Sequence, residues 1–256
     1  MSMLFATNHT GYCQSVPQSH VFVDGEELTY NVRYYNFDLG QVRIKTLKRI
    51  ENGKSVSYQT IAYIDSYKKV PLANLHAVFE SLIDTAVYSQ SFSGKALDGD
   101  SWAFGRYKFD YSAKRVFMES GRRDTIVHRR DTLVLDSKMQ DGLSLFFYAR
   151  DRLFSGKREN IPAVVQEKKV NTYINFSGKR KSVELDFVEY PVDVVGFDGT
   201  MEFTGIFGLT GDFEGWFSND DARVPIVAQM KVILGSVTIE LMQWNRPGWK
   251  PPKGIE

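Results

Sequence analysis

The sequence predicts a mainly β protein: a single large antiparallel sheet, curled or barrel-like (a half-barrel or lipocalin-like form), with one or two short helices. Segments in which apolar and polar residues alternate recur roughly every 8–14 residues, as strands do in curled sheets and barrels. Aromatic residues, which favour strands, make up 14% of the chain. Only one stretch carries clear helix signals, and no linker, low-complexity block or repeat divides the chain.

The first strands are expected to pair antiparallel through short turns. Residues 28–34 carry an apolar or aromatic side chain at every second position, as a half-buried strand does, and residues 42–47 repeat this pattern. The pair Asn52-Gly53 predicts a hairpin, because these residues readily adopt the positive φ angles of a type I′ turn. Residues 56–63 then form the returning strand.

The segment 71–84 fits two structures. Its leucines and Phe79 form a helical stripe after Pro71, whereas residues 78–83 equally fit a strand. Further strands are expected at 88–92, 102–110, 114–119, 125–128, 132–135, 163–165, 170–176 and 182–190, with a turn at 177–180 between the last two. Pro225 cannot donate a ladder hydrogen bond, so it predicts a sheet edge or a bulge.

The helix signals begin at Asp141, a favourable N-cap residue, and end near Gly156. The residues expected in the body of this helix are Leu143, Phe146, Phe147 and Arg150.

The N-terminal segment 1–19 is either the remainder of an export signal or a disordered tail. It opens with a short apolar stretch but lacks the basic region and the apolar length of a complete signal. The first interpretation places the protein in the periplasm or otherwise outside the cytoplasm. Residues 20–249 are expected to form one β-rich domain, and residues 250–256 a C-terminal tail.

Composition and motifs exclude several classes of function. A net charge of +1 gives no global field that attracts nucleic acid, and no apolar run is long enough for a transmembrane helix. The single cysteine, Cys13, excludes an internal disulfide framework. Nucleotide-binding glycine loops, zinc-protease motifs and nucleophile elbows are absent, and the four histidines are scattered. We therefore expect no catalytic residues, no cofactor and no metal site.

One polar turn near the C-terminus concentrates charged and aromatic residues, and two interpretations of it remain open. In the structural one, one aspartate accepts N–H bonds of the turn while Arg223 forms a salt bridge with the other. In the functional one, Asp220 and Asp221 form an acidic rim beside an aromatic mouth made by Trp216 and Phe217.

Several groups of residues resemble the motifs of an exported bacterial family named domain of unknown function 3108. They are Gly25-Glu26-Glu27-Leu28-Thr29-Tyr30-Asn31-Val32 with Tyr34 and Gly40; Phe79-Glu80-Ser81-Leu82-Ile83-Asp84; Tyr107-Lys108-Phe109-Asp110; Asp141-Gly142-Leu143-Ser144 with Tyr148-Ala149-Arg150; and Trp216-Phe217-Ser218-Asn219-Asp220-Asp221-Ala222-Arg223-Val224-Pro225 with Gly235-Ser236-Val237 and Glu240-Leu241. The resemblance implies an exported, β-rich envelope protein of Gram-negative bacteria without an established activity.

Three functions follow from these observations. The first is non-enzymatic binding of a lipid or other amphipathic molecule in a cavity of the sheet. The second is a structural or assembly role with another envelope protein, which predicts a filled core and an exposed apolar patch or bare sheet edge. The third is a carboxylate-based hydrolase. The candidate binding residues are Trp216, Phe217, Tyr148, Arg150, Asp220, Asp221 and Arg223.

Overall fold

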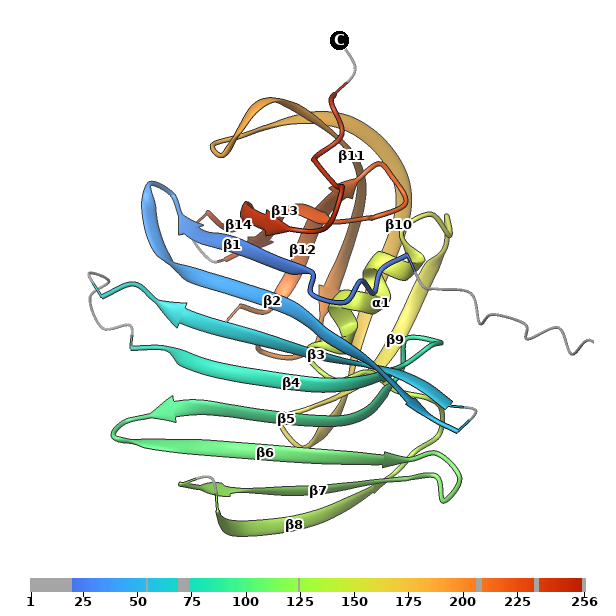
Figure 1. Cartoon of the computed structure of the whole chain (residues 1–256). Coiled ribbons are helices and arrows are strands. Elements are labelled where there is room, and N and C mark those ends of the chain that lie inside the picture. The colour runs from blue at the N-terminus through green and yellow to red at the C-terminus, as the bar shows by residue number, and fades with distance from the viewer. Residues whose placement is uncertain are drawn as a thin grey trace, which may run out of the picture.

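A computed structural model describes residues 20–53, 55–68, 74–123, 125–205, 209–232 and 235–254 of the chain. In these ranges the chain forms one antiparallel sheet of fourteen strands and one helix, which confirms the predicted fold class (Figure 1). The elements are β1 (Glu27–Tyr34), β2 (Phe37–Asn52), β3 (Ser55–Ser66), β4 (His76–Asp84), β5 (Ser89–Asp98), β6 (Ser101–Asp110), β7 (Arg115–Arg122), β8 (Ile126–Val134), α1 (Ser144–Arg152), β9 (Arg158–Val165), β10 (Lys168–Leu185), β11 (Val188–Met201), β12 (Gly211–Ser218), β13 (Pro225–Lys231) and β14 (Ser236–Asn245).

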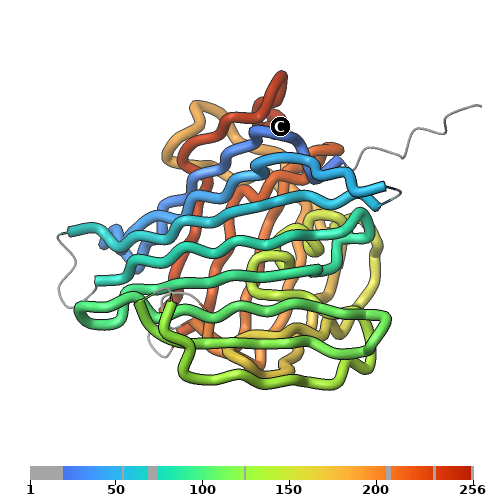
Figure 2. Tube along the Cα trace, turned by 60° about the horizontal axis from the view of Figure 1, so that its bottom comes forward, coloured from blue at the N-terminus to red at the C-terminus, as the bar shows by residue number. Residues whose placement is uncertain are grey.

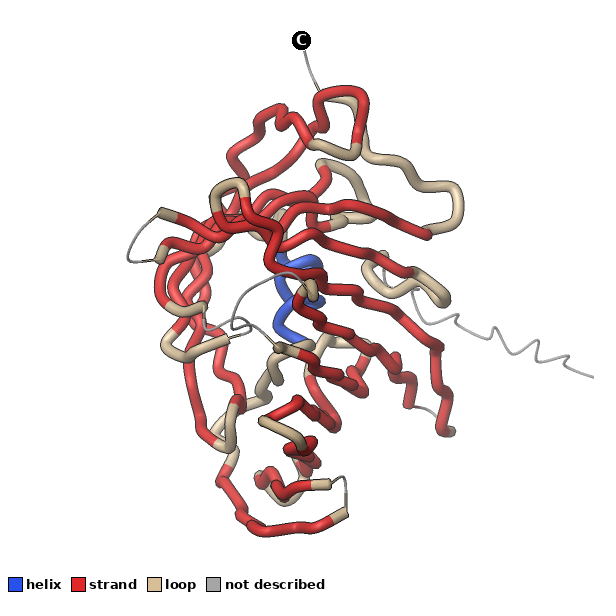
Figure 3. The backbone as a smooth tube through the Cα atoms, turned by 90° about the vertical axis from the view of Figure 1, so that its left-hand side faces the viewer, coloured by secondary structure: helices blue, strands red, loops and turns tan. Residues whose placement is uncertain are grey.

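The sheet is strongly curled, and its two halves meet where β1 pairs with β14. All other neighbours in the sheet are also neighbours in the sequence, because the strand order runs from β8 back to β1 and then from β14 back to β9. Figures 2 and 3 show the two halves facing each other, with α1 lying between them. The sheet is not closed, because β8 and β9 do not pair with each other.

The two edge strands of the sheet, β9 and β8, differ in whether another segment covers them. Beside β9, the Gln140 N–H donates to the Pro162 carbonyl at 2.9 Å, and the Val164 N–H donates to the Gln140 carbonyl at 2.8 Å. The segment before α1 therefore covers the edge of β9. The described strands include none that pairs with the outer edge of β8.

The main hydrophobic core surrounds α1. The Phe22 ring stacks on Tyr58 of β3 at 4.3 Å and on Phe147 of α1 at 4.9 Å, and all three side chains are buried. A smaller cluster joins β6 and β7 to the connection before α1 and to β9. It consists of Tyr107, Phe109, Val116, Met118, Leu135, Met139 and Val164. Helix and sheet thus fill one end of the interior.

The helix begins close to where the sequence predicted, although Leu143, expected in its body, lies just before its first residue, Ser144. One oxygen of the buried Asp141 carboxyl, Oδ1, accepts hydrogen bonds from the backbone N–H groups of Leu143 at 2.7 Å and Ser144 at 2.8 Å. These N–H groups have no partner within the helix, so the carboxyl caps it. The helix ends at Arg152, shortly before Gly156, which has a φ of +65°.

Among the other local predictions, one open alternative is decided, one hairpin is found and one turn is wrong. Residues 76–84 form a strand, β4, which decides between the two structures that the sequence left open. The predicted hairpin is confirmed, but its turn begins one residue later than expected, because Asn52 still belongs to β2 and pairs with Ser55, and Gly53 has a φ of +60°. The turn predicted at 177–180 is wrong, because β10 runs through it as a single strand with a bulge. Gly178, at a φ of +66°, serves that bulge rather than a turn.

Near the C-terminus, Pro225 lies beside a bulge, as its missing N–H group predicted. The two short β segments predicted at 125–128 and 132–135 form the single strand β8. Part of the predicted C-terminal tail pairs with β11, because Asp193 N–H donates to the Pro252 carbonyl at 2.9 Å and Gly254 N–H to the Pro191 carbonyl at 2.6 Å.

Candidate functional site

The polar turn between β12 and β13 is organised by Asp220. Its Oδ1 atom accepts hydrogen bonds from the N–H groups of Ala222 and Arg223, both at 3.0 Å, and from the Ser218 hydroxyl at 2.7 Å. Its Oδ2 atom accepts a hydrogen bond from the Trp249 indole at 2.8 Å. All of these contacts stabilise the turn, so Asp220 acts as the structural interpretation expected.

The salt bridge expected between Arg223 and Asp221 is wrong. Asp221 is exposed, and the Arg223 guanidinium instead donates to the Asp151 carbonyl at 2.6 Å. The physical reason is that the last carbonyls of a helix lack partners within it and attract cations. Arg223 also has a left-handed backbone, with a φ of +47°. It joins the β12–β13 turn to the C-terminal end of α1.

Arg150 is fully buried and lies at the centre of the same region. Its guanidinium donates to both carboxylate oxygens of Glu26, at 2.7 and 3.0 Å, and to the Ala222 carbonyl at 3.0 Å. Arg246 binds the same carboxylate. Burial alone would raise the pKa of Glu26, but the charges and hydrogen bonds of the two arginines lower it below its ordinary value. We call Glu26, Arg150 and Arg246 the buried clamp.

Trp216 and Phe217 lie on opposite faces of the sheet, because successive residues of a strand alternate. Phe217 is buried inside, with its ring 4.8 Å from Phe197. Trp216 is outside, where the Lys181 ammonium lies 3.4 Å from its ring centre and partial burial lowers the pKa of Lys181. The two aromatic side chains therefore do not line one mouth together.

Tyr148 is separate from both groups. Its hydroxyl donates to Glu159 Oε2 at 2.7 Å, and its ring lies 6.0 Å from that of Tyr88. Burial, followed by the contact with Glu159, raises the pKa of Tyr148. The structure thus brings Arg150, Asp220 and Arg223 together beside α1. Tyr148 lies on the same helix but contacts Glu159 instead, Asp221 is exposed on the turn, and Trp216 and Phe217 lie on β12.

The sequence analysis missed two rows of aromatic rings. The first ladder crosses β4, β5 and β6, with ring centres 5.7 Å apart from Phe79 to Phe92 and 5.2 Å apart from Phe92 to Tyr107. The second ladder crosses β10, β11 and β12 and is centred on Phe197. Its other members are Phe176, Phe213 and Phe217.

The register places the first ladder on the inner face of the sheet. Paired residues on neighbouring strands point to the same side, and Phe79 of the first ladder pairs with Ala62. Ala62 lies four residues after Tyr58, and therefore on the same face of β3 as that core ring. Tyr58 in turn stacks on Phe22 in the core around α1.

The second ladder faces inward by the same argument. A series of cross-strand pairs leads from Phe197 through Gly215, and across β13 and β14, to Val32 of β1. These positions therefore lie on the same face of the sheet. Tyr30 on the same face of β1 contacts the α1 residue Phe146, with 6.3 Å between ring centres. No ring pair between the two ladders is found in the part of the chain that the structure describes.

Glycines make room for these rings on the sheet. A Cβ atom at Gly94 would come within 2.9 Å of the Phe92 ring, and one at Gly215 within 2.5 Å of the Phe197 ring. A ring that covers a glycine lies along its own half of the sheet instead of reaching across the interior. The pattern Phe-x-Gly occurs in the ladders at 92–94, 176–178, 197–199 and 213–215, but it also occurs outside them at 154–156 and 203–205, so it is not specific to the ladders.

The inward-facing side chains at the end away from α1 are only partly buried. The apolar residues of this kind are Phe79, Ala96, Met201, Phe213 and Ile239. They pack against the main core yet remain accessible, whereas core side chains beside α1 such as Phe22, Tyr58 and Phe147 are buried. We call this region, between the two ladders, the open end of the interior.

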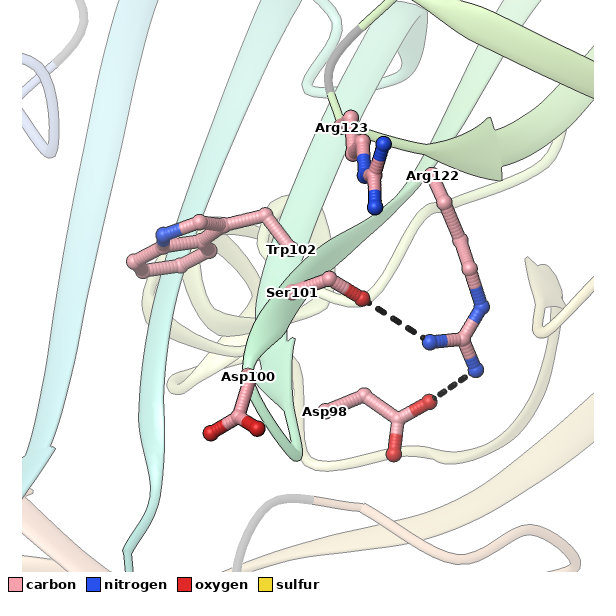
Figure 4. Close-up of a pocket in the computed structure, with 6 residues that line it drawn as sticks. All are labelled: Asp98, Asp100, Ser101, Trp102, Arg122 and Arg123. Carbon is pink, nitrogen blue, oxygen red and sulfur yellow. Dashed lines mark hydrogen bonds and ion pairs between the residues drawn. The ribbon is translucent and has the colours of Figure 1, made fainter.

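The two best-defined surface depressions lie outside the ladders. One, of about 510 Å³, is lined by Asp98, Asp100, Ser101, Trp102, Arg122 and Arg123 at the turns that follow β5 and β7. Figure 4 shows Arg122 bound to Asp98 and Ser101, with the Trp102 indole directed away from them. The other, of about 150 Å³, lies on the outer face of β4–β6. Charged side chains make up at least half of the residues that line each depression.

Comparison with known proteins identifies the family and the fold. The family model described as "Protein of unknown function (DUF3108)" matches residues 29–242. A β-barrel-like protein from Brucella abortus, of domain of unknown function DUF1849, has 12% sequence identity and a TM-score of 0.54 over 88% of this chain and 98% of that one. A Bacteroides fragilis protein with a YmcC-like fold covers the same 88%, with 97% of its own length, 8% identity and a TM-score of 0.37.

No curated protein matches the chain. Among the described residues, no helix is long and apolar enough to span a bilayer.

Proposed function

The chain belongs to the DUF3108 family, and we propose that it is an exported, non-enzymatic protein that binds an apolar or amphipathic molecule between its two aromatic ladders. The observation that carries this proposal is the partial exposure of inward-facing apolar side chains at the open end. Apolar surface that faces inward and is still accessible favours an apolar occupant, because burying it releases about 25 cal/mol per Å².

The shape of the two ladders supports an extended ligand. Their rings lie along the sheet, and the nearby positions Ala77, Ala96 and Ala103 form a paired row of small side chains at the open end. An acyl chain or a flat apolar molecule would contact rings on both sides. Mouths of curled sheets and barrels are frequent ligand sites for the same reason.

The candidate residues of the sequence analysis take different places in this proposal. Phe217 and Phe197 form the base of the second ladder. Arg150, Asp220 and Arg223 hold the structure around α1, where Glu26 is neutralised by two arginines. Glu26 is buried and both of its oxygens bind arginines, so it is poorly placed for acid–base catalysis, which weighs against the hydrolase alternative.

An assembly role would use the bare edge of β8. That strand has a bulge opposite Ser120 and Gly121, and the ion pair between Arg129 and Asp131 at 2.6 Å lies on it. Bulges and charged side chains are devices that prevent edge pairing. The β8 edge therefore supports this alternative less well than the open end supports ligand binding.

The experiment is titration of the purified protein with N-phenyl-1-naphthylamine, whose fluorescence rises in apolar surroundings. We expect saturable binding that Ala96→Trp weakens about tenfold or more, because an indole would fill the space between the ladders. Ser93→Trp on the outer face of the same strand is the matched control and should bind the probe as the wild type does. Absence of saturable binding, or equal losses in both variants, would contradict the proposal.

Native mass spectrometry of protein purified from cell envelopes addresses the natural ligand. We expect an adduct of lipid-like mass in the wild type and in Ser93→Trp, and a bare polypeptide in Ala96→Trp. An adduct that persists in Ala96→Trp would place the ligand elsewhere on the molecule.

A further inference from the structure

The turn between β1 and β2 carries two of the most exposed large apolar side chains among the described residues. Phe37 is 71% exposed and Tyr35 is 61% exposed. The turn lies at the open end, because Tyr34 pairs with Phe37 on one side and with Val237 of β14 on the other. Figure 1 shows this turn at the left of the molecule, on the same side as the β5–β6 turn, whereas α1 lies towards the right.

This exposed turn has a defined conformation. Tyr35 has a left-handed backbone, with a φ of +49°, which is uncommon for an aromatic residue. Its ring packs edge-on against Tyr34 at 4.8 Å and lies over Gly235 in the β13–β14 turn, where a Cβ atom would come within 2.5 Å of the Tyr35 hydroxyl. Such a conformation persists only where surrounding contacts hold it. These contacts therefore hold the turn, and its exposed aromatic residues, in a defined conformation at the surface.

The charged groups around this turn are two carboxylates that share one arginine, and two lysines. Asp38 accepts hydrogen bonds from Asn31 at 2.7 Å and from Arg33 at 3.3 Å, and Arg33 also binds Asp186 at 2.6 Å. Asp38 and Asp186 thus share the single guanidinium of Arg33 and keep one net negative charge between them. Two lysines, Lys68 and Lys231, have no ion-pair partner in the described ranges.

Both lysines lie beside the turn in the fold. Lys68 follows Tyr67, whose N–H group donates to the Leu39 carbonyl of β2 at 3.0 Å. Lys231 pairs with Ser236, the neighbour of the glycine on which Tyr35 lies. The turn therefore combines exposed aromatic rings with cations that lack partners.

We propose that the β1–β2 turn docks the protein on a bilayer that contains anionic lipids, with Phe37 and Tyr35 entering the interface. Aromatic rings, tyrosine above all, are favoured at that depth, and lysines near an anionic lipid surface add electrostatic attraction. Docking by this turn directs the open end towards the membrane. The proposal goes beyond ligand binding and does not depend on it, since the turn contacts the bilayer whether or not the interior is occupied.

The first test is flotation of the full chain with phosphatidylcholine vesicles that either contain or lack phosphatidylglycerol. We expect binding to the anionic vesicles, weakened about fivefold or more in Phe37→Ser because an exposed ring no longer enters the interface. Phe117→Ser removes another exposed ring, on β7, and should leave binding unchanged. Lys68→Glu with Lys231→Glu should abolish the preference for anionic vesicles, whereas Lys108→Glu should not.

The second test reports where the turn lies. In a Cys13→Ser background, Phe37→Cys labelled with an environment-sensitive fluorophore should shift to the blue when anionic vesicles are added, and labelled Phe117→Cys should not. A wild type that floats no better than Phe37→Ser, or equal shifts at both labelled positions, would overturn the proposal. So would concentration-dependent dimerisation in ultracentrifugation that Phe37→Ser abolishes, because a second copy would then cover the turn.

The two proposals fail independently. Ala96→Trp should lose the naphthylamine probe and still float with vesicles. Phe37→Ser should bind the probe in solution and no longer float.

Discussion

The two ends of the interior differ in what fills them. At the α1 end, helix and sheet bury the clamp of Glu26, Arg150 and Arg246 together with core residues such as Phe147 and Leu153. At the open end, partly exposed rings such as Phe79 and Phe213 lie along the sheet. The contrast teaches that the specific polar contacts of this chain fix α1 at one end, and that the apolar side chains at the other end stay partly exposed.

The largest expected effect comes from breaking the clamp. Arg150→Met leaves Glu26 buried with only Arg246 beside it, so we expect a loss of about 3–5 kcal/mol in the free energy of unfolding. Urea denaturation at neutral pH measures this loss. Arg152→Ala, two residues further along the same helix and partly exposed, is the control and should cost less than about 1 kcal/mol. Similar losses in both variants would show that the clamp is not what fixes α1.

The same substitution at both ends compares them directly. Ala149 on α1 is buried, so Ala149→Leu should overpack the core and cost about 1–3 kcal/mol. Ala96→Leu places the same side chain at the open end, where it should cost less than about 1 kcal/mol or even stabilise the fold by filling space. Thermal unfolding of the two variants gives the comparison. Equal destabilisation would mean that the open end is packed as tightly as the α1 end.

The sequence predicted the curled antiparallel sheet well, because strand alternation and the Asn52-Gly53 turn are local signals. It also predicted the cap of α1, since Asp141 contacts N–H groups only two and three residues away. The partners of Arg150 could not be predicted in this way. Glu26 lies 124 residues from it in the sequence, and only the fold brings the two together.

The site was harder to predict for a related reason. Trp216 and Phe217 are adjacent in sequence, and the strand alternation that the analysis used elsewhere separates them onto opposite faces. The aromatic ladders depend on pairing between strands, so single strands show them only through the Phe-x-Gly pattern, which also occurs outside them. Arg223 was assigned to a neighbouring aspartate, although the carbonyls of a helix end far away in sequence compete better for it.

Arg223 allows a smaller test of how α1 is held at its C-terminal end. Arg223→Ala removes the hydrogen bond to the Asp151 carbonyl, and we expect a loss of about 1–2 kcal/mol in unfolding free energy. Arg223→Gly removes the same contact but suits the left-handed backbone, so it should cost about 0.5 kcal/mol less than Arg223→Ala. A melting curve unchanged in Arg223→Ala would show that this contact does not stabilise the turn.

The smallest effect concerns the pH dependence of the α1 end, where two buried carboxyls are shifted in opposite directions. The pKa of Glu26 is lowered, so its contribution to stability is present above its ordinary pKa of 4.5 and is lost as the pH falls through the folded value. Burial raises the pKa of Asp141, although hydrogen bonds from the Ser81 hydroxyl and the helix N–H groups oppose the shift. Its contribution is therefore complete below 3.8 and is lost as the pH rises through the folded value.

Asp141→Asn separates these two contributions, because the amide oxygen still caps α1 and the side chain no longer titrates. We expect the unfolding free energy at pH 7, relative to that at pH 4, to rise in this variant by up to about 1 kcal/mol. Asp110→Asn is a control of opposite sign, because the Ser112 hydroxyl lowers the pKa of the exposed Asp110. In this variant the unfolding free energy at pH 7, relative to that at pH 4, should fall. If the free-energy difference between pH 7 and pH 4 shrinks in Asp141→Asn as well, the folded protein stabilises the ionised form of Asp141. The α1 end would then hold a stabilised carboxylate in addition to the buried clamp.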